Sequence, residues 1–252
     1  MEEKKSIIDS IPPRSAFKFG LITGIAGILI IGFFVLLGMI INDKTGDDQK
    51  TTNTVTNNQP TANQPTATQG IQLADIKVDQ IGKDDWVKGD SKAKISLIEF
   101  SDADCPYCTK FHDTVNQILK DYNGKVKVAY RHFPLPQLHP EAPKKAEAIE
   151  CVGELGGNDK VWAFMDKLFV ASKPTVAQLG DVVAGLGIDK AKFQTCLDSG
   201  KYTNKVSTQS AAAQAAGAQG TPYSVIIFGD KKFKVNGAYP YEDIKKVLDT
   251  LK

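Results

Sequence analysis

The sequence predicts an α/β domain that is preceded by a single N-terminal transmembrane helix. Two observations carry this prediction. An uncharged apolar segment runs from Phe19 to Ile41. Further along, a Cys-x-x-Cys motif stands between a β-rich run and an amphipathic helical pattern, and a second β-rich run follows that pattern. The order strand, motif, helix, strand is that of a βαβ unit.

The composition excludes several classes of protein. Hydrophobic residues make up 42% and charged residues 24% of the 252 residues, near the globular average, so the chain is neither wholly disordered nor collagen-like. A formal net charge of +2 argues against a dedicated nucleic-acid binder. Four cysteines are too few for a disulfide-rich miniprotein, although their even number allows all of them to pair.

The apolar segment is long enough to cross a membrane. Its 23 residues, Phe19 to Ile41, would span about 34 Å as a helix, against a hydrocarbon core of ~30 Å. A cleaved signal peptide is the alternative, but its apolar region is usually ~7–15 residues long and ends in a small-x-small site, which this segment lacks. We therefore expect an uncleaved anchor at residues 19–41.

The flanks of the segment predict its orientation. Four basic residues precede it, whereas two lysines stand beside three aspartates directly after it. The positive-inside rule then places residues 1–18 in the cytoplasm and the rest of the chain outside, in the periplasm or on the outer face of the cell membrane. Residues 42–70 are rich in Thr, Asn, Gln and Pro, so we expect a disordered tether that leads to a domain at 71–252.

The domain alternates between β and helical character. The expected strands are Lys94 to Phe100, Val126 to Phe133, Ser224 to Phe228 and Lys232 to Val235. Apolar residues at helical spacing predict a helix from Cys108 to Tyr122, with Gly124 as its cap, and a closing helix from Tyr241 to Leu251. Between them, about 141–216 is helical and is interrupted by glycines and by Pro174.

The CPYC motif is placed for redox chemistry. Pro106 suits the first helical position, which makes Cys105 the residue that caps the helix. There the helix dipole and unpaired backbone N–H groups favour the thiolate, the species that attacks a disulfide. Cys108 lies one turn further on, on the apolar face, so we expect an exposed attacking Cys105 and a shielded resolving Cys108. The alternative, a zinc site with His112, lacks a fourth ligand and a second CxxC, so we expect no metal.

Cys151 and Cys196 form a second pair in the helical stretch. Both lie on apolar helix faces, and they are either two buried free cysteines or a structural disulfide. An oxidising compartment favours the bond, which would close a loop of about 45 residues and stabilise the domain by roughly 4 kcal/mol. The remaining histidines, His132 and His139, and both tryptophans are expected to be structural, and the lysines to lie on solvated faces.

The domain carries four motifs in a fixed order: IEFSDADCPYC, YRHFPL, GTPYSVIIFG and NGAYP. Together with the helical stretch they resemble the DsbA-like branch of the thioredoxin superfamily, from about Trp86 to the end of the chain. The resemblance implies a thioredoxin-like fold with a helical insertion at about 141–216. It also implies a thiol-disulfide oxidoreductase that needs no cofactor.

The resemblance assigns roles to single residues. Cys105 would attack and Cys108 would resolve, Thr221 and a cis Pro222 would hold the substrate backbone, and Glu99 would be a buried acid that moves protons. Two alternatives stay open: Thr221-Pro222 as an ordinary trans turn, and Glu99 on an edge strand facing solvent.

One departure from the family pattern concerns the residue between the cysteines. Well-studied oxidases of this family have histidine where this chain has Tyr107, and Pro-Tyr also occurs in glutaredoxins and in a reducing or isomerising relative. The direction of electron flow is therefore open. The lead hypothesis is a monomeric, membrane-tethered oxidase of unfolded, cysteine-containing secreted proteins, reset by a membrane redox partner. The alternatives are a reductase or isomerase, and a non-catalytic peptide- or metal-binding module on the same fold.

Overall fold

The computed structural model describes residues 70–251. The predicted cytoplasmic residues, the anchor at 19–41 and the tether up to residue 69 lie outside the described residues, so these parts remain predictions. Within residues 70–251, no helix combines the length and the apolar character needed to span a bilayer.

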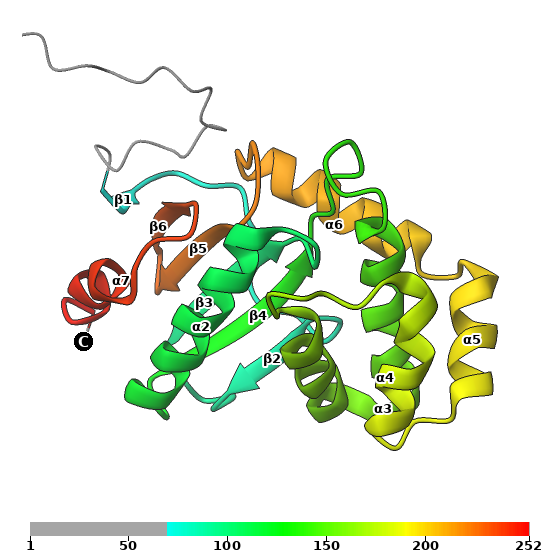
Figure 1. Cartoon of the computed structure of the whole chain (residues 1–252). Helices are drawn as coiled ribbons and strands as arrows, with labels where there is room; N and C mark the ends of the chain where they lie inside the picture. Colours follow the sequence, from blue (N-terminus) through cyan, green and yellow to red (C-terminus); the bar gives the residue numbers. More distant parts are fainter. Residues whose placement is uncertain (1–69, 252) are drawn as a thin grey trace, which may run out of the picture. The chain divides into compact units, whose positions relative to one another are not determined.

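The described chain folds as one mixed sheet with helices on both faces (Figure 1). The sheet has six strands in the order β1-β6-β5-β3-β4-β2. Their bounds are β1 Gln72–Leu73, β2 Trp86–Gly89, β3 Ile95–Ser101, β4 Val126–His132, β5 Tyr223–Phe228 and β6 Lys231–Asn236. Among the strands of the described chain, only β3 and β4 run parallel, because the helix between them carries the chain across as a βαβ crossover.

The helices follow the predicted order. They are α2 Pro106–Asp121, α3 Ala142–Leu168, the 3₁₀ turn η2 Val176–Gln178, α4 Leu179–Gly185, α5 Lys190–Ser199, α6 Thr203–Ala215 and α7 Tyr241–Leu248. The expected insertion corresponds to α3 through α6, and α3 is kinked at Gly157, where φ is 77°. The closing helix ends three residues earlier than expected, at Leu248, although Leu251 remains buried.

The central strand β3 is buried along its whole length and separates two cores. Alternation along the strand directs Ile95 and Leu97 to the core under α2, α3 and α7, whereas Ile98 and Phe100 face a second core that α6 covers. Figure 1 shows α3, α4 and α5 gathered beside the β4–β2 edge of the sheet. Helix α2, whose first turn carries the Cys-x-x-Cys motif, packs against β4 and α7.

Strands β1 and β2 were not expected from the sequence. β2 pairs antiparallel with β4, with Trp86 opposite Tyr130, and it extends the sheet beneath the insertion. Trp86 lies against Gly153 of α3 so closely that a Cβ at position 153 would come within 2.1 Å of its ring. The expected packing role of Trp86 thus includes fixing α3 to the sheet edge.

Candidate functional site

The N-terminus of α2 carries the CPYC motif. Cys105 is the N-cap residue, with extended backbone angles (φ −69°, ψ 126°), and Pro106 occupies the first turn. The Thr109 N–H donates to the Cys105 carbonyl at 3.2 Å, which is the first bond of the helix. The Cys105 sulfur therefore lies beside backbone N–H groups that have no partner within the helix, as the sequence predicted.

The expectation that Cys105 is exposed was wrong. Its exposed fraction is 4%, and that of Cys108 is 0%. The segment Thr221-Pro222, whose peptide bond is cis, lies against Cys105, and the Cys105 thiol donates to the Thr221 carbonyl oxygen at 3.4 Å. A neighbour 116 positions away in sequence thus covers the thiol, which a local helix pattern does not reveal.

The two thiols differ sharply in acidity. A hydrogen bond from Cys108, joined by contacts with Thr221 and with the backbone of residues 107 and 108, outweighs burial and lowers the pKa of Cys105 from 9.0 to about 6. Burial raises the pKa of Cys108 well above 9.0, and the nearby charges of Cys105 and Glu99 raise it further. At neutral pH Cys105 is therefore largely thiolate and Cys108 remains a thiol.

Glu99 lies beneath the cysteines in β3. It is 3% exposed and shares a face of the strand with Leu97 and Ser101, the face that packs under α2. Burial raises the pKa of its carboxyl from 4.5 to about 7, and the neighbouring Ser101 hydroxyl opposes this rise by a smaller amount. Among the described residues, Glu99 Oε1 has no hydrogen-bond partner. The carboxyl is thus buried, not solvent-facing, and can exchange a proton near neutral pH.

The raised pKa of Glu99 predicts a pH-dependent stability in the dithiol form. Between pH 4.5 and about 7 the folded protein binds a proton at Glu99 that the unfolded chain does not bind, so stability is lost as pH rises through this window. The variant Glu99→Gln lacks this titration. Its free energy of unfolding, measured with urea, should therefore rise relative to wild type by ~3 kcal/mol from pH 4.5 to pH 8.

The exposed Glu242 of α7 provides the matched control for this measurement. Glu242→Gln makes the same chemical change at the surface, and its free energy of unfolding is measured at the same pH values. A difference between wild type and Glu99→Gln that is constant from pH 4.5 to pH 8 would contradict the buried, titrating carboxyl.

The loop before Cys105 is fixed by an acidic side chain that sequence reasoning missed. Asp102 has a side-chain exposure of 0%; it accepts hydrogen bonds from the Asp104 N–H at 2.7 Å and the Leu135 N–H at 2.8 Å. It also bonds His139 Nδ1 at 2.9 Å. His139 is therefore structural, as expected. Similarly, His132 bonds the buried Glu150 at 2.8 Å.

Two lysines of the insertion also reach this loop. The expectation that the lysines lie on solvated faces was wrong for Lys145, whereas Lys173 is half-buried. Lys145 of α3 is 3% exposed and forms an ion pair with Asp104 at 2.5 Å. Lys173, between α3 and η2, donates to the Ala103 carbonyl at 3.0 Å and to Thr109 Oγ1 at 2.6 Å. Lysine is abundant in this chain, so its sequence pattern gave no signal for either contact.

An open groove adjoins the cysteines. Its volume is about 960 Å³, and its walls include Tyr107 and Lys110 of α2, Thr221 and Pro222, and Tyr239 after β6. Tyr107 is 39% exposed, one of the few large apolar side chains of the described domain that face solvent. The groove thus brings together the residue between the cysteines and the segment that covers Cys105.

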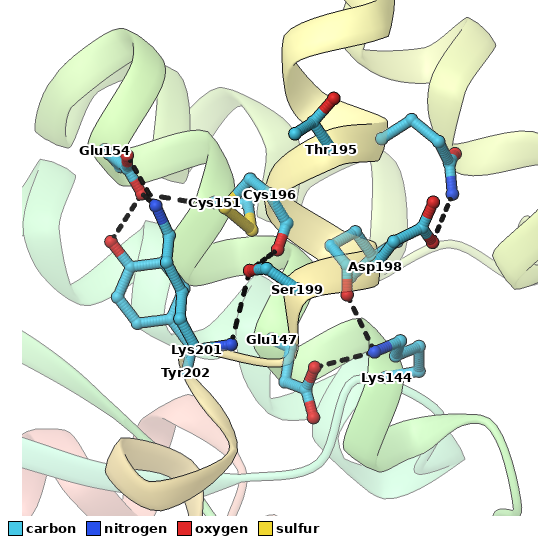
Figure 2. Close-up of a disulfide and its surroundings, with 12 residues drawn as sticks. Lys144, Glu147, Cys151, Glu154, Thr195, Cys196, Asp198, Ser199, Lys201 and Tyr202 are labelled. Atoms are coloured by element: carbon cyan, nitrogen blue, oxygen red, sulfur yellow. Dashed lines mark hydrogen bonds and ion pairs between the residues drawn. A yellow bond between two sulfur atoms is a disulfide. The ribbon is translucent and has the colours of Figure 1, made fainter.

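The second cysteine pair is bonded in the structure. Figure 2 shows the disulfide between Cys151 of α3 and Cys196 of α5, whose sulfurs are 2.04 Å apart. Lys144 supports the same junction, because it donates to the Leu197 carbonyl and to Glu147, both at 2.8 Å. The cross-link therefore holds two helices of the insertion together, well away from the CPYC motif in sequence.

The alternative zinc set is not assembled. His112 Nε2 lies 2.7 Å from Asp166, so its ring pairs with the end of α3. In the part of the chain that the structure covers, no three His, Cys, Asp or Glu side chains form a group that could hold a metal ion. What the site offers chemically is a pair of free thiols, one acidic and one not, above a buried carboxyl.

Solved structures share this fold. Oxidised BdbD from Bacillus subtilis matches with a TM-score of 0.59 at 25% sequence identity, over 67% of this chain and 92% of that chain. The thiol-disulfide exchange protein alpha-DsbA2 from Wolbachia pipientis matches with a TM-score of 0.56 at 23% identity, over 66% of this chain and 86% of that chain. The described domain thus has a thioredoxin-like fold with a helical insertion and with DsbA-like structural neighbours.

Comparison of sequences gives the family. The chain is 30% identical over 142 residues to the Na(+)/H(+) antiporter NhaA 3 of Salinispora tropica, a match to 55% of this chain that spans only about a fifth (21%) of that protein's length. A family model described as thioredoxin matches residues 82–250, which include both cysteines of the motif and the segment Thr221-Pro222. Because this match covers well over half of the 252 residues, the chain belongs to the thioredoxin family.

Proposed function

We propose that the protein is a thiol-disulfide oxidoreductase that oxidises cysteines of secreted proteins. The observation that carries the proposal is the difference in acidity within one CxxC motif, with the pKa of Cys105 lowered to about 6 and that of Cys108 raised well above 9.0. Disulfide exchange needs this difference in pKa between the two thiols. The nucleophilic cysteine must attack and leave as a thiolate, whereas the resolving cysteine stays protonated until it reacts.

The oxidase reaction starts from the Cys105–Cys108 disulfide. A substrate thiolate attacks the Cys105 sulfur, the bond between the two cysteines breaks, and Cys108 leaves with the electron pair and takes a proton. Glu99, whose pKa is about 7, is placed to supply this proton. A second substrate thiolate then attacks the substrate sulfur of the mixed disulfide and releases Cys105 as thiolate. The substrate gains a disulfide and the motif is left as the dithiol.

The substrate chain is proposed to bind in the groove beside the motif. Thr221 and Pro222 would present backbone groups to an extended peptide, and Tyr107 would give it an apolar contact. The name of the Wolbachia protein, a thiol-disulfide exchange protein, is consistent with this use of the fold. The proposed substrates are therefore unfolded chains with accessible cysteines.

The proposed location is the outer side of a cell membrane. The apolar segment at 19–41 would anchor the protein with residues 1–18 in the cytoplasm, and residues 42–70 would tether the domain. A disulfide in the insertion suits an oxidising compartment. In this setting a membrane redox partner would restore the Cys105–Cys108 disulfide after each cycle, and the protein would act as a monomer.

A disulfide reductase or isomerase is the second candidate, and the Pro-Tyr dipeptide is the observation that favours it. The acidity of Cys105 argues in the opposite direction. Stabilising the Cys105 thiolate stabilises the reduced motif, and this makes the Cys105–Cys108 disulfide a stronger oxidant. The lowered pKa of Cys105 therefore favours an oxidant, although its value of about 6 stays above the ~3.5 of DsbA.

The reduction potential of the Cys105–Cys108 pair tests the proposal. The full-length protein is equilibrated in glutathione buffers, and the redox state is read by mass spectrometry of the peptide that carries both cysteines. We expect a potential clearly above that of thioredoxin, together with oxidation of a dithiol peptide by the disulfide form. A potential near ~ −270 mV would contradict an oxidase and favour the reductase.

A further inference from the structure

Lys173 connects the insertion to both sides of Cys105. It stands in the loop after α3, and its ammonium group donates to the Ala103 carbonyl at 3.0 Å, to Thr109 Oγ1 at 2.6 Å and to the Leu168 carbonyl at 3.3 Å. Ala103 precedes the motif, whereas Thr109 belongs to the first turn of α2 and bonds the Cys105 carbonyl at 3.2 Å through its N–H. One side chain thus contacts the chain before and after the attacking cysteine.

Among residues 70–251, no carboxylate lies within hydrogen-bond distance of the Lys173 ammonium group. Its three N–H groups bond two carbonyl oxygens and one hydroxyl, all of them neutral acceptors. The nearest acidic residue of the loop, Asp104, is paired with Lys145 at 2.5 Å. The ammonium is also partly removed from solvent, with the Phe169 ring 5.3 Å away. Its field is therefore less screened than that of a surface lysine and acts on the nearest groups that become negative.

Those groups are the two cysteines. Burial and the neighbouring Lys145 lower the pKa of Lys173, whereas Asp104 and the two cysteines, when they are ionised, raise it. Such coupling is reciprocal: if a thiolate favours the protonated lysine, the protonated lysine favours the thiolate by the same free energy. The hydrogen bonds to Cys105 contribute more to its acidity, so Lys173 adds to an effect that the helix N-terminus begins.

We propose that Lys173 is a positioning residue for the CPYC motif, whose charge favours the reduced pair with its Cys105 thiolate over the disulfide and so increases the oxidising strength of the protein. This inference rests on the proposed function, because it concerns the same disulfide exchange. It gives the helical insertion a role at the active site, through a loop that lies 64 positions from Thr109 in sequence.

Three variants of the full-length protein test the proposal. Lys173→Met keeps most of the aliphatic stem and removes the charge, and Lys173→Arg keeps the charge. Lys192→Met removes the same charge from an exposed position on α5 and is the matched control. The thiolate is titrated by its ultraviolet absorbance, and the equilibrium with glutathione is measured as for wild type.

We expect Lys173→Met to raise the pKa of the titrating thiol and to lower the equilibrium constant for reduction of the motif by about three- to tenfold, where tenfold corresponds to roughly 30 mV. Lys173→Arg should recover most of both changes, and Lys192→Met should match wild type. If Lys173→Met does not fold, Lys173→Gln, which keeps a hydrogen-bond donor, replaces it with the same expectation.

The outcomes separate this inference from the proposed function. Unchanged thiolate titration and glutathione equilibrium in Lys173→Met would overturn the inference while leaving a protein that still exchanges disulfides. Equal shifts in Lys173→Met and Lys173→Arg would also overturn it, because the shape of the side chain and not its charge would then matter. A wild-type protein that does not exchange disulfides at all would refute the proposed function instead.

Discussion

Replacing Cys105 by serine should reduce disulfide exchange to the uncatalysed rate. The pKa of Cys105 is lowered to about 6, so at neutral pH it is the thiolate of the pair, whereas burial keeps Cys108 protonated. A serine hydroxyl at the same position forms no disulfide and is not ionised at this pH. The measurement is the oxidation of a dithiol peptide, or the reduction of a disulfide peptide, by the full-length protein.

Cys108→Ser is the matched control for this variant. It leaves the attacking thiol in place and removes the group that resolves the mixed disulfide. We therefore expect it to react once with a disulfide peptide and to accumulate a covalent adduct at Cys105, which mass spectrometry detects. Turnover by Cys105→Ser at the wild-type rate, or an adduct on Cys108 in that variant, would show that the roles of the two cysteines are not as proposed.

Features that depend on local sequence were predicted well. Pro106 placed the start of α2, and the apolar spacing from Cys108 onward identified the face that is now buried against the sheet. The strands β3 and β4 were predicted to within one residue at each end, because β3 is buried along its whole length and β4 is buried at every residue except Lys127. In such segments the spacing of the apolar residues matches the side chains that are buried, so the sequence alone is enough to identify the helix or strand.

Features that depend on distant partners could not be predicted from local sequence patterns. β2 consists of Trp86–Gly89, with a lysine and a glycine among its four residues, and only its pairing with β4 makes it a strand. The contact between Cys105 and Thr221 likewise joins residues 116 positions apart, and only the family resemblance had indicated that Thr221-Pro222 faces the motif. Neither has a local pattern, because the free energy that favours each comes from the neighbour and not from the segment.

The charged residues around the CPYC motif were also hard to predict from local sequence. The family resemblance pointed to Glu99 through its distance from Cys105, whereas Lys145 and Lys173 have no motif of their own. Both lysines contact the loop at Ala103 and Asp104 from the insertion. A lysine is usually solvated, so its burial becomes apparent only when the position of the insertion relative to α2 is known.

Removing the disulfide between Cys151 and Cys196 should have the largest effect on stability. The bond closes a loop with a sequence separation of 45, and it joins α3 to α5 at the centre of the insertion. In the chain-entropy model such a cross-link restricts the unfolded chain enough to stabilise the folded state by ~4 kcal/mol. The double substitution to alanine should lower the free energy of unfolding by about this amount.

The experiment needs a background in which the redox motif cannot react. In the variant Cys105→Ser/Cys108→Ser, only Cys151 and Cys196 remain, so dithiothreitol acts on the structural bond alone. Urea unfolding of this variant is compared with and without dithiothreitol, and then with the variant that also carries alanine at both positions. Dithiothreitol should lower the stability of the Cys105→Ser/Cys108→Ser protein toward that of the variant with the two added alanines. It should leave the stability of the alanine variant unchanged.

The comparison also separates the cross-link from the packing of its sulfur atoms. Cys151 is 0% exposed and Cys196 is 6% exposed, so alanine at both positions also removes buried volume. Reduction keeps both sulfurs, and the loss that it causes therefore measures the restriction of the unfolded chain. If reduction costs less than ~1 kcal/mol while the alanine variant loses ~4 kcal/mol, packing and not loop closure would be the source of the stabilisation.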